Sequence, residues 1–247
     1  MIPKFEIVIE KIKRIPVFNH LRKIPVLKSI SRRLRENYID KRIESVQVYG
    51  YEMLDKIFNV SQELDIPIWI DWGTLLGFFR GGKLIEHDYD LDVATWRLNI
   101  EEHKRFLDIM SNNGFDLVRR FSIHDEILTE AFEYKGVLMD VEYYLREGNN
   151  AVTFSFDLSN ESITTLKNGE QFIDGMNLYQ YRFSENGLFI SCFSNGTKCY
   201  VPSDTEQRVL AEYGPSWKTP IKNASWKDLH NYDDLGFNKD LKGWRKK

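Results

Sequence analysis

Three aspartates that alternate along the short stretch 87–93 are the residues best suited to do chemistry. Alternate residues of a β-strand share a face, so Asp88, Asp90 and Asp92 are predicted to line one side of a strand and the intervening residues the other. Three carboxylates in a row repel one another, and a fold keeps such a row where a cation binds. Mg²⁺ or Mn²⁺ suits this row, because these hard ions take oxygen ligands and share them with phosphates.

The stretch before the aspartates is predicted to supply an anion site. Ile66–Trp72 is rich in β-formers and predicts a buried strand, Gly73 and Thr74 predict a turn, and a short helix is expected over Leu75–Arg80. The N-terminus of such a helix has free backbone N–H groups that suit a phosphate. Arg80 adds a planar, permanently charged fork.

A further acidic pair lies in a strand predicted over Val137–Tyr144. There Asp140 and Glu142 alternate with apolar residues, so both carboxylates are expected on one face. This strand either brings a further acid to the aspartate row or is an edge strand with a polar face turned to solvent.

The string GTLLGFFRGGKLIEHDYDLDV at 73–93 resembles the signature of the LicD/fukutin family of phosphotransferases, which have the nucleotidyltransferase fold. The family pattern is roughly G-T-L-L-G-x-x-R, a bend containing glycine, and I-P-W-D-x-D-x-D. The matching positions are Gly73, Thr74, Leu75, Leu76, Gly77, Arg80, Ile85, Asp88, Asp90 and Asp92. Glu86 and His87 depart from the pattern, where Pro-Trp is usual.

A second match lies about a hundred residues downstream. The closing segment of the same family resembles residues 201–220. This stretch has V-P at 201–202, a short helix to Leu210 and Y-G-x-x-W-x-x-P over 213–220. Two ordered matches are more specific than either alone. The competing interpretation is a glycine turn followed by an acidic surface strand.

The resemblance implies a metal-dependent enzyme. It would use Mg²⁺ or Mn²⁺ to transfer a phosphate-linked substituent from a CDP-linked donor to a hydroxyl of a cell-surface glycan such as lipopolysaccharide, and CMP would leave. The implied catalytic residues are Asp90, Asp92 and Asp140, the implied metal ligands Asp88, Asp90, Asp92 and Asp140, and the implied donor-binding residues Gly73, Thr74 and Arg80. Whether Asp140 is a ligand or the base stays open, as does the number of metals.

The implied fold is α+β, a nucleotidyltransferase-like mixed sheet flanked by helices. We expect a basic amphipathic segment over 1–42, with short bent helical pieces, and a catalytic domain over 43–247 that has a β-rich insertion at 151–200. Helices are predicted over 41–63, 99–113 and 203–213. The last has Ser203 as the N-cap and Glu206 closing a capping box. Strands are predicted over 115–121 and 127–134, and the lysine-rich tail after Asn238 is expected to be mobile.

Charge is distributed unevenly along the chain. Residues 1–42 carry twelve Lys or Arg against four acids, a net charge of +8. Because the whole chain has a net charge of −3, the remaining residues carry a net charge of −11. The acidic body argues against nucleic-acid binding. The basic segment either lies on an anionic membrane surface or packs on the domain or a partner subunit. Two cysteines, no span and no signal peptide favour a cytoplasmic protein, with peripheral attachment to the inner face of the membrane left open.

Two other functions compete with the LicD-like reaction. A nucleotidyltransferase would use the same acids but release pyrophosphate, and a non-enzymatic adaptor would keep the fold and bind a membrane or partner through 1–42. The transferred group (choline, ribitol, glycerol or a sugar phosphate), the acceptor, including a lipid-linked one, and the oligomeric state are not decided by the sequence.

Overall fold

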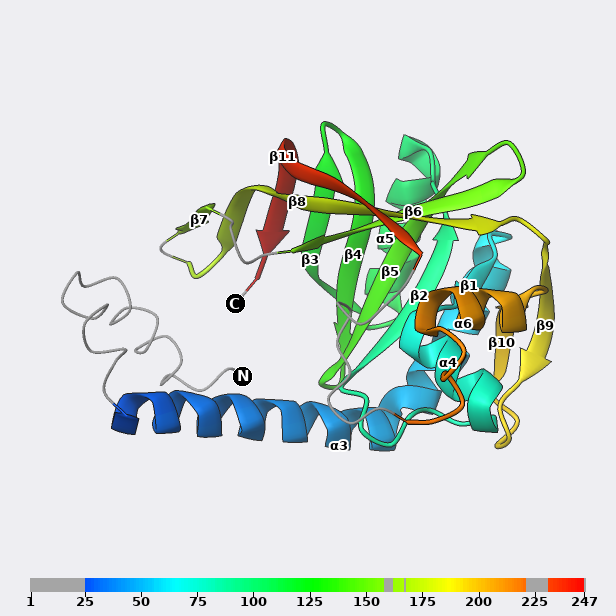
Figure 1. The fold of residues 1–247 in the computed structure, drawn as a ribbon, viewed down its shortest axis with the longest axis horizontal. Helices are drawn as coiled ribbons and strands as arrows, with labels where there is room; N and C mark the ends of the chain where they lie inside the picture. Colours follow the sequence, from blue (N-terminus) through cyan, green and yellow to red (C-terminus); the bar gives the residue numbers. More distant parts are fainter. Residues whose placement is uncertain (1–24, 158–161, 167, 221–230, 247) are drawn as a thin grey trace.

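The structure, a computed structural model, describes residues 25–157, 162–166, 168–220 and 231–246 (Figure 1). Its helices are α3 Pro25–Leu64, α4 Trp72–Gly81, α5 Ile100–Asn112 and α6 Thr205–Tyr213. Its strands are β1 Ile68–Ile70, β2 Asp90–Trp96, β3 Asp116–Ile123, β4 Glu126–Tyr134, β5 Val137–Glu147, β6 Asn150–Asp157, β7 Ser162–Thr165, β8 Gln171–Ser184, β9 Leu188–Cys192, β10 Lys198–Pro202 and β11 Tyr232–Arg245.

The described strands form one mixed sheet, in which β1–β10 and β2–β5 are parallel pairs and the others antiparallel. The order is β4-β3-β11-β8-β6-β5-β2-β1-β10-β9, and β4 also pairs with β5. This last pairing closes β3, β4, β5, β6, β8 and β11 into a ring, which β2, β1, β10 and β9 extend as an open sheet. The mixed sheet is confirmed. The β-rich insertion beside it is not, because β6 and β8 are members of the ring itself.

The elements around the aspartates begin at different residues from those predicted. Strand β2 begins at Asp90, so Asp88 and Tyr89 lie in the turn before it. Helix α4 begins at Trp72, so Gly73 and Thr74 lie in its first turn and do not form a separate turn. Glycine ends this helix, with Gly82 as the C-cap at φ 65°.

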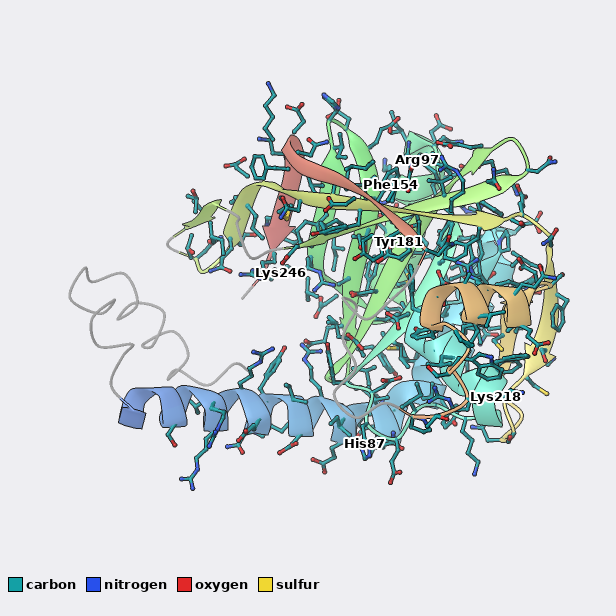
Figure 2. The ribbon with its side chains drawn as sticks, viewed as in Figure 1. His87, Arg97, Phe154, Tyr181, Lys218 and Lys246 are labelled. Atoms are coloured by element: carbon teal, nitrogen blue, oxygen red, sulfur yellow. The ribbon has the colours of Figure 1, made fainter. Side chains whose placement is uncertain are left out.

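The main hydrophobic core lies on one face of the sheet. Side chains at alternate positions of β2 and β5, among them Leu91, Val93 and Met139, pack with the inner faces of α3 and α5. Asp90, Asp92 and Asp140 alternate with these apolar residues and therefore lie on the opposite face. There a second cluster of aromatic residues includes Trp69, Tyr144 and Tyr181. Figure 2 labels Tyr181 of this cluster.

Helix α3 is a continuous 40-residue helix whose N-terminal part extends past the sheet (Figure 1). Pro25 is its first residue, where a missing N–H costs nothing, so from there on the predicted bends are absent. The boundary predicted at 42/43 falls inside this helix. Residues 1–24 lie outside the described part of the chain. No described helix is both long and apolar enough to cross a bilayer.

Two predictions about the C-terminal third are wrong. Residues 239–245 of the tail that was expected to be mobile belong to β11, which pairs with β3 and β8 and fully buries Leu241. The capping box at Ser203 and Glu206 does not form: Asp204 is the N-cap of α6 and its side chain makes no capping bond.

Candidate active site

Two of the predicted acids are brought together by strand pairing. Strands β2 and β5 run parallel with Asp92 directly opposite Asp140, and Asp90 lies on the same face two residues earlier. Of the two interpretations of the 137–144 strand, the structure shows an interior strand whose acids face the aspartate row.

Asp88 reaches the same place from the turn before β2. A Cβ built on Gly73 would lie 3.1 Å from Oδ2 of Asp92 and 3.4 Å from Oδ2 of Asp88. The two carboxylates therefore meet over the bare Cα of Gly73, where a larger residue would press on both. This is a steric role for the glycine.

Burial and neighbouring carboxylates raise the pKa of Asp90 and Asp92. Burial, followed by the charges of Asp90, Asp140 and Asp88, holds the pKa of Asp92 well above its ordinary value. Burial, Asp140 and Asp88 raise the pKa of Asp90 to about 7, and burial raises that of Asp88 to about 6. Tyr89 was predicted on the opposite face, yet Asp90 and burial raise its pKa to about 12, so its phenol also lies near these charges. The cluster therefore holds more negative charge than its surroundings compensate.

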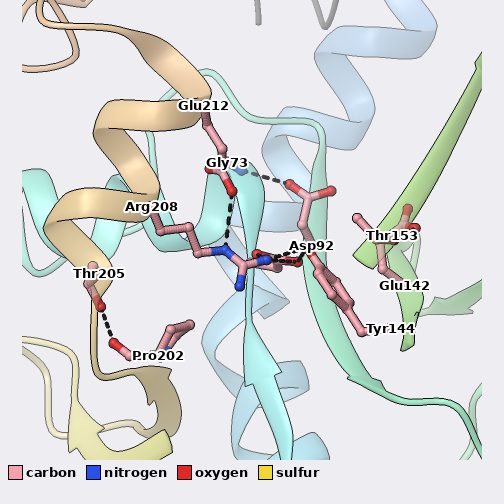
Figure 3. Close-up of polar contacts among 10 residues, drawn as sticks. Gly73, Asp92, Glu142, Tyr144, Thr153, Pro202, Thr205, Arg208 and Glu212 are labelled. Atoms are coloured by element: carbon pink, nitrogen blue, oxygen red, sulfur yellow. Dashed lines mark hydrogen bonds and ion pairs between the residues drawn. The ribbon is translucent and has the colours of Figure 1, made fainter. Parts of the chain in front are cut away.

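The start of α4 holds Asp92 in place. The N–H of Gly73 donates to Oδ2 of Asp92 at 3.0 Å (Figure 3), and the N–H of Asp92 donates to Oγ1 of the buried Thr74 at 2.8 Å. The helix N-terminus that was predicted to meet a phosphate therefore meets a carboxylate in this structure. Binding of a donor by Gly73 and Thr74 stays a prediction.

Asp88, Asp90, Asp92 and Asp140 are the residues that could hold a metal ion, because they supply the hard oxygen ligands that Mg²⁺ and Mn²⁺ take. The described residues contain no ready-made group of three or more such side chains. Two of the four carboxylates are directed to other partners, Asp92 to Gly73 and Asp140 to Arg119. The ligand types fit a divalent ion, and rotation of these side chains would be needed to gather them.

Arg80 connects the two family segments. Its Nε donates to the carbonyl oxygen of Trp217 at 3.0 Å, its Nη2 donates to the same oxygen, and the rings of Phe79 and Trp217 lie 5.0 Å apart. Burial lowers the pKa of Arg80, while the charges of Tyr213 and Asp88 oppose this. The guanidinium thus has a structural partner and lies within electrostatic range of Asp88. Its predicted role as a phosphate clamp is untested.

The exchange Arg80→Lys separates these two roles. Lysine keeps the charge but loses the fork, so we expect the KM for the donor to rise about tenfold, the KM for the acceptor to stay nearly unchanged, and the melting temperature to fall by a few degrees. Steady-state kinetics and calorimetry measure these quantities. An unchanged donor KM beside a lowered melting temperature would make Arg80 purely structural.

A buried charged network, absent from our predictions, joins α4 to α6 (Figure 3). Arg208 pairs with Asp71 at 2.9 Å and with Glu212 at 3.2 Å, and the hydroxyl of Tyr144 donates to Asp71 at 2.8 Å. Arg208 is 4% exposed and both carboxylates are fully buried. Asp71 is the N-cap of α4, but its carboxylate is used here and makes no capping bond. The network therefore fixes the N-cap residue of α4.

One arginine between two buried carboxylates makes stability depend on pH. Burial raises the pKa of Glu212 from 4.5 to about 8. Because folding raises the pKa of this carboxyl, the folded state loses stability when the group ionises. The free energy of unfolding should therefore fall as pH rises from about 4.5 to 8, by on the order of a few kcal/mol. Glu212→Gln should flatten this decline in melting temperature measured between pH 5 and 8.5. Glu206→Gln, on the exposed face of α6, is the control, and a Glu212→Gln curve parallel to that of the unaltered protein would contradict the assignment.

Acids on neighbouring strands beside the start of a short helix are the arrangement expected of a nucleotidyltransferase-type domain. The family model described as LicD/FKTN/FKRP, nucleotidyltransferase domain, matches residues 65–189, just over half of the 247 residues. The chain belongs to this family.

Curated relatives carry the name ribitol-5-phosphate transferase FKTN. The mouse (Mus musculus) protein is 26% identical over 204 residues, 80% of this chain and 40% of that protein. The human (Homo sapiens) protein is 25% identical over 194 residues, 76% of this chain and 38% of that protein. The chain thus spans about two fifths of the length of these relatives.

Among solved structures, the crystal structure of the Megavirus polyadenylate synthase matches 49% of this chain and 26% of its own, with a TM-score of 0.28 and 17% sequence identity. At this TM-score the two folds share too little for that protein to inform on this one.

Proposed function

We propose that this protein transfers a phosphate-linked substituent from a CDP-activated donor to a hydroxyl of a glycan and releases CMP. The observation that carries the proposal is the pairing of Asp92 with Asp140, beside Asp88 and Asp90, in a chain of the LicD family. The names of the FKTN relatives make ribitol 5-phosphate the first substituent to test.

The reaction would proceed by displacement at phosphorus. The acceptor oxygen bonds to the phosphorus distal to the nucleoside, the bond from that phosphorus to the bridging oxygen breaks, and CMP leaves with the bridging oxygen. The hydroxyl proton goes to a base, for which Asp140 is the candidate.

Mg²⁺ or Mn²⁺ would be held by Asp88, Asp90 and Asp92, and by Asp140 as well if another group takes the proton. The ion would neutralise charge that develops on the phosphate oxygens. This role accounts for an acid cluster whose charge the described residues leave largely uncompensated. Contact of residues 1–42 with a membrane, a lipid-linked acceptor and a cytoplasmic location stay predictions.

The test is incubation with a panel of CDP-ribitol, CDP-glycerol and CDP-choline, with Mg²⁺ or Mn²⁺ and a glycan acceptor. We expect release of CMP from one donor, dependent on the metal and on the acceptor. Release of pyrophosphate from CTP, with no CMP from any CDP-linked donor, would instead identify a classical nucleotidyltransferase. An absence of any nucleotide product together with an absence of Mn²⁺ binding would favour the adaptor.

A further inference from the structure

Two arginines from distant parts of the chain flank the carboxylate cluster. Arg119 comes from β3 and Arg42 from α3. Burial and the neighbouring carboxylates raise the pKa of Asp90, and the charges of both arginines oppose that rise. Both guanidinium groups therefore lie within electrostatic range of the same aspartate.

Arg119 reaches the cluster across the sheet. Arg119, Ala131 and Asp140 are aligned on the neighbouring strands β3, β4 and β5, and Asp92 of β2 is next in the row. The small side chain of Ala131 leaves room for Arg119 to extend over it, and Nη2 donates to both carboxylate oxygens of Asp140, at 2.5 and 2.6 Å. The side chain is 27% exposed, and its Nε is buried with no hydrogen-bond partner among the described residues.

Arg42 comes from the helix and pairs with Glu133 of β4, which the strand register places in line with Leu138 of β5 and Asp90 of β2. Its Nη2 pairs with Glu133 at 3.2 Å and its Nε donates to the hydroxyl of Tyr38 at 2.6 Å. The side chain is only 12% exposed, and within the described part of the chain its Nη1 is buried without a partner. A buried N–H without an acceptor is costly, and such a group calls for an explanation.

We propose that Arg42 and Arg119 bind the diphosphate of the donor, opposite the carboxylates that would hold the metal. This rests on the proposed function, which supplies the diphosphate. A guanidinium binds phosphate oxygens through two parallel N–H groups, and each of these arginines has an N–H to offer. Arginine has several rotatable bonds, so each fork can turn toward an anion while its stem stays packed.

With Arg42 in the diphosphate site, the catalytic region begins before the domain boundary predicted between residues 42 and 43. Arg42 belongs to the segment 1–42 by position, but its charge acts on Asp90 of the carboxylate cluster and its guanidinium pairs with Glu133 of β4. A chain that begins at Ile43 would lack one of the two forks. Truncation tests of the basic segment should therefore keep Arg42 and begin no later than Tyr38.

The experiment compares Arg42→Lys, Arg119→Lys and the double variant, each of which keeps its charge but loses its fork. Arg120→Lys is the matched control, because Arg120 is the next residue on β3 and pairs with the buried Glu130 on the other face of the sheet. Binding of inorganic pyrophosphate and of CDP is measured by calorimetry at saturating Mn²⁺, and Mn²⁺ affinity and melting temperature are measured alongside.

We expect each single variant to bind both probes about tenfold more weakly and the double variant about a hundredfold more weakly. Mn²⁺ affinity should stay the same or rise in Arg119→Lys, because Arg119 competes for Asp140. Arg120→Lys should lower the melting temperature alone and leave the affinities unchanged.

The outcomes separate this proposal from the proposed function. Unaltered affinity for both probes in all arginine variants would overturn the diphosphate site and leave the transferase proposal standing. Equal losses for Mn²⁺ and the probes would make the arginines mere positioning residues for the acids and would also overturn it. If the unaltered protein binds pyrophosphate through the arginines but does not bind CDP, the diphosphate site stands and the CDP-dependent reaction falls.

Discussion

Asp90→Asn and Asp92→Asn should each lower the transferase activity at least about a hundredfold while leaving the thermal stability equal to or above that of the unaltered protein. The loss follows because each carboxylate would hold an ion worth several kcal/mol to the transition state. The stability should not fall, because burial and neighbouring carboxylates raise the pKa of both Asp90 and Asp92, so each costs stability when ionised.

The direction of the stability effect can be checked against pH in metal-free protein. The pKa of Asp90 is about 7 in the fold and about 4 when unfolded, so ionising it costs stability as pH rises between these values. The melting temperature of Asp90→Asn should therefore exceed that of the unaltered protein by a margin that grows from pH 4 to pH 7. Asp116→Asn, an exposed aspartate on β3, is the control.

Calorimetry with Mn²⁺ decides the assignment of the acids. Both variants should bind Mn²⁺ at least tenfold more weakly than the unaltered protein, since each removes a charged oxygen ligand. If both variants bind Mn²⁺ as tightly as the unaltered protein, Asp90 and Asp92 are not metal ligands, whatever the activity of the variants.

The grouping of the acids could be predicted from the sequence because their spacing obeys a local rule. Alternation along a strand places Asp90 with Asp92, and a second alternating pattern places Asp140 on a strand of the same kind. Asp88 was correctly grouped with them although it precedes β2, since the turn returns it to the space over Gly73.

The positions of Arg42 and Arg119 beside the acids could not be predicted from the sequence, because only tertiary structure distinguishes these arginines from others. Arg119 and Arg120 are neighbours, and the register of β3 with β4 decides that Arg119 faces Asp140 and Arg120 faces Glu130. Arg42 lies in a helix whose charge pattern resembles a solvated surface. The closure of the ring was likewise hidden, because β11 pairs with strands more than fifty residues away and its lysines resemble those of a free tail.

Capping shows the same competition between local and tertiary partners. Asp71 immediately precedes α4 and has the side chain of an N-cap, yet Arg208 and Tyr144 take its carboxylate. Asp92, from β2, accepts the N–H of Gly73 instead. A local rule predicts a cap there, and contacts from 73 and 137 residues downstream decide otherwise.

Arg208→Met is expected to lower the stability more than any substitution in the carboxylate cluster. It leaves the carboxylate of Asp71 fully buried with no cation beside it, which costs about 3–5 kcal/mol, or roughly 10 °C in melting temperature for a chain of this length. Arg208→Lys keeps the charge and should lose less, since it sacrifices only the fork and the stacking over Phe183. Thermal unfolding followed by calorimetry measures both losses.

A double variant tests whether the loss comes from the unpaired charge. Asp71→Asn in the Arg208→Met background removes that charge, so it should recover part of the stability lost in the single variant. Because Asp71 begins the helix whose Gly73 holds Asp92, the activity should stay low even where stability recovers. If the double variant is instead less stable than Arg208→Met by the full cost of Asp71→Asn alone, the two residues are independent, and the network does not connect α6 to the acids.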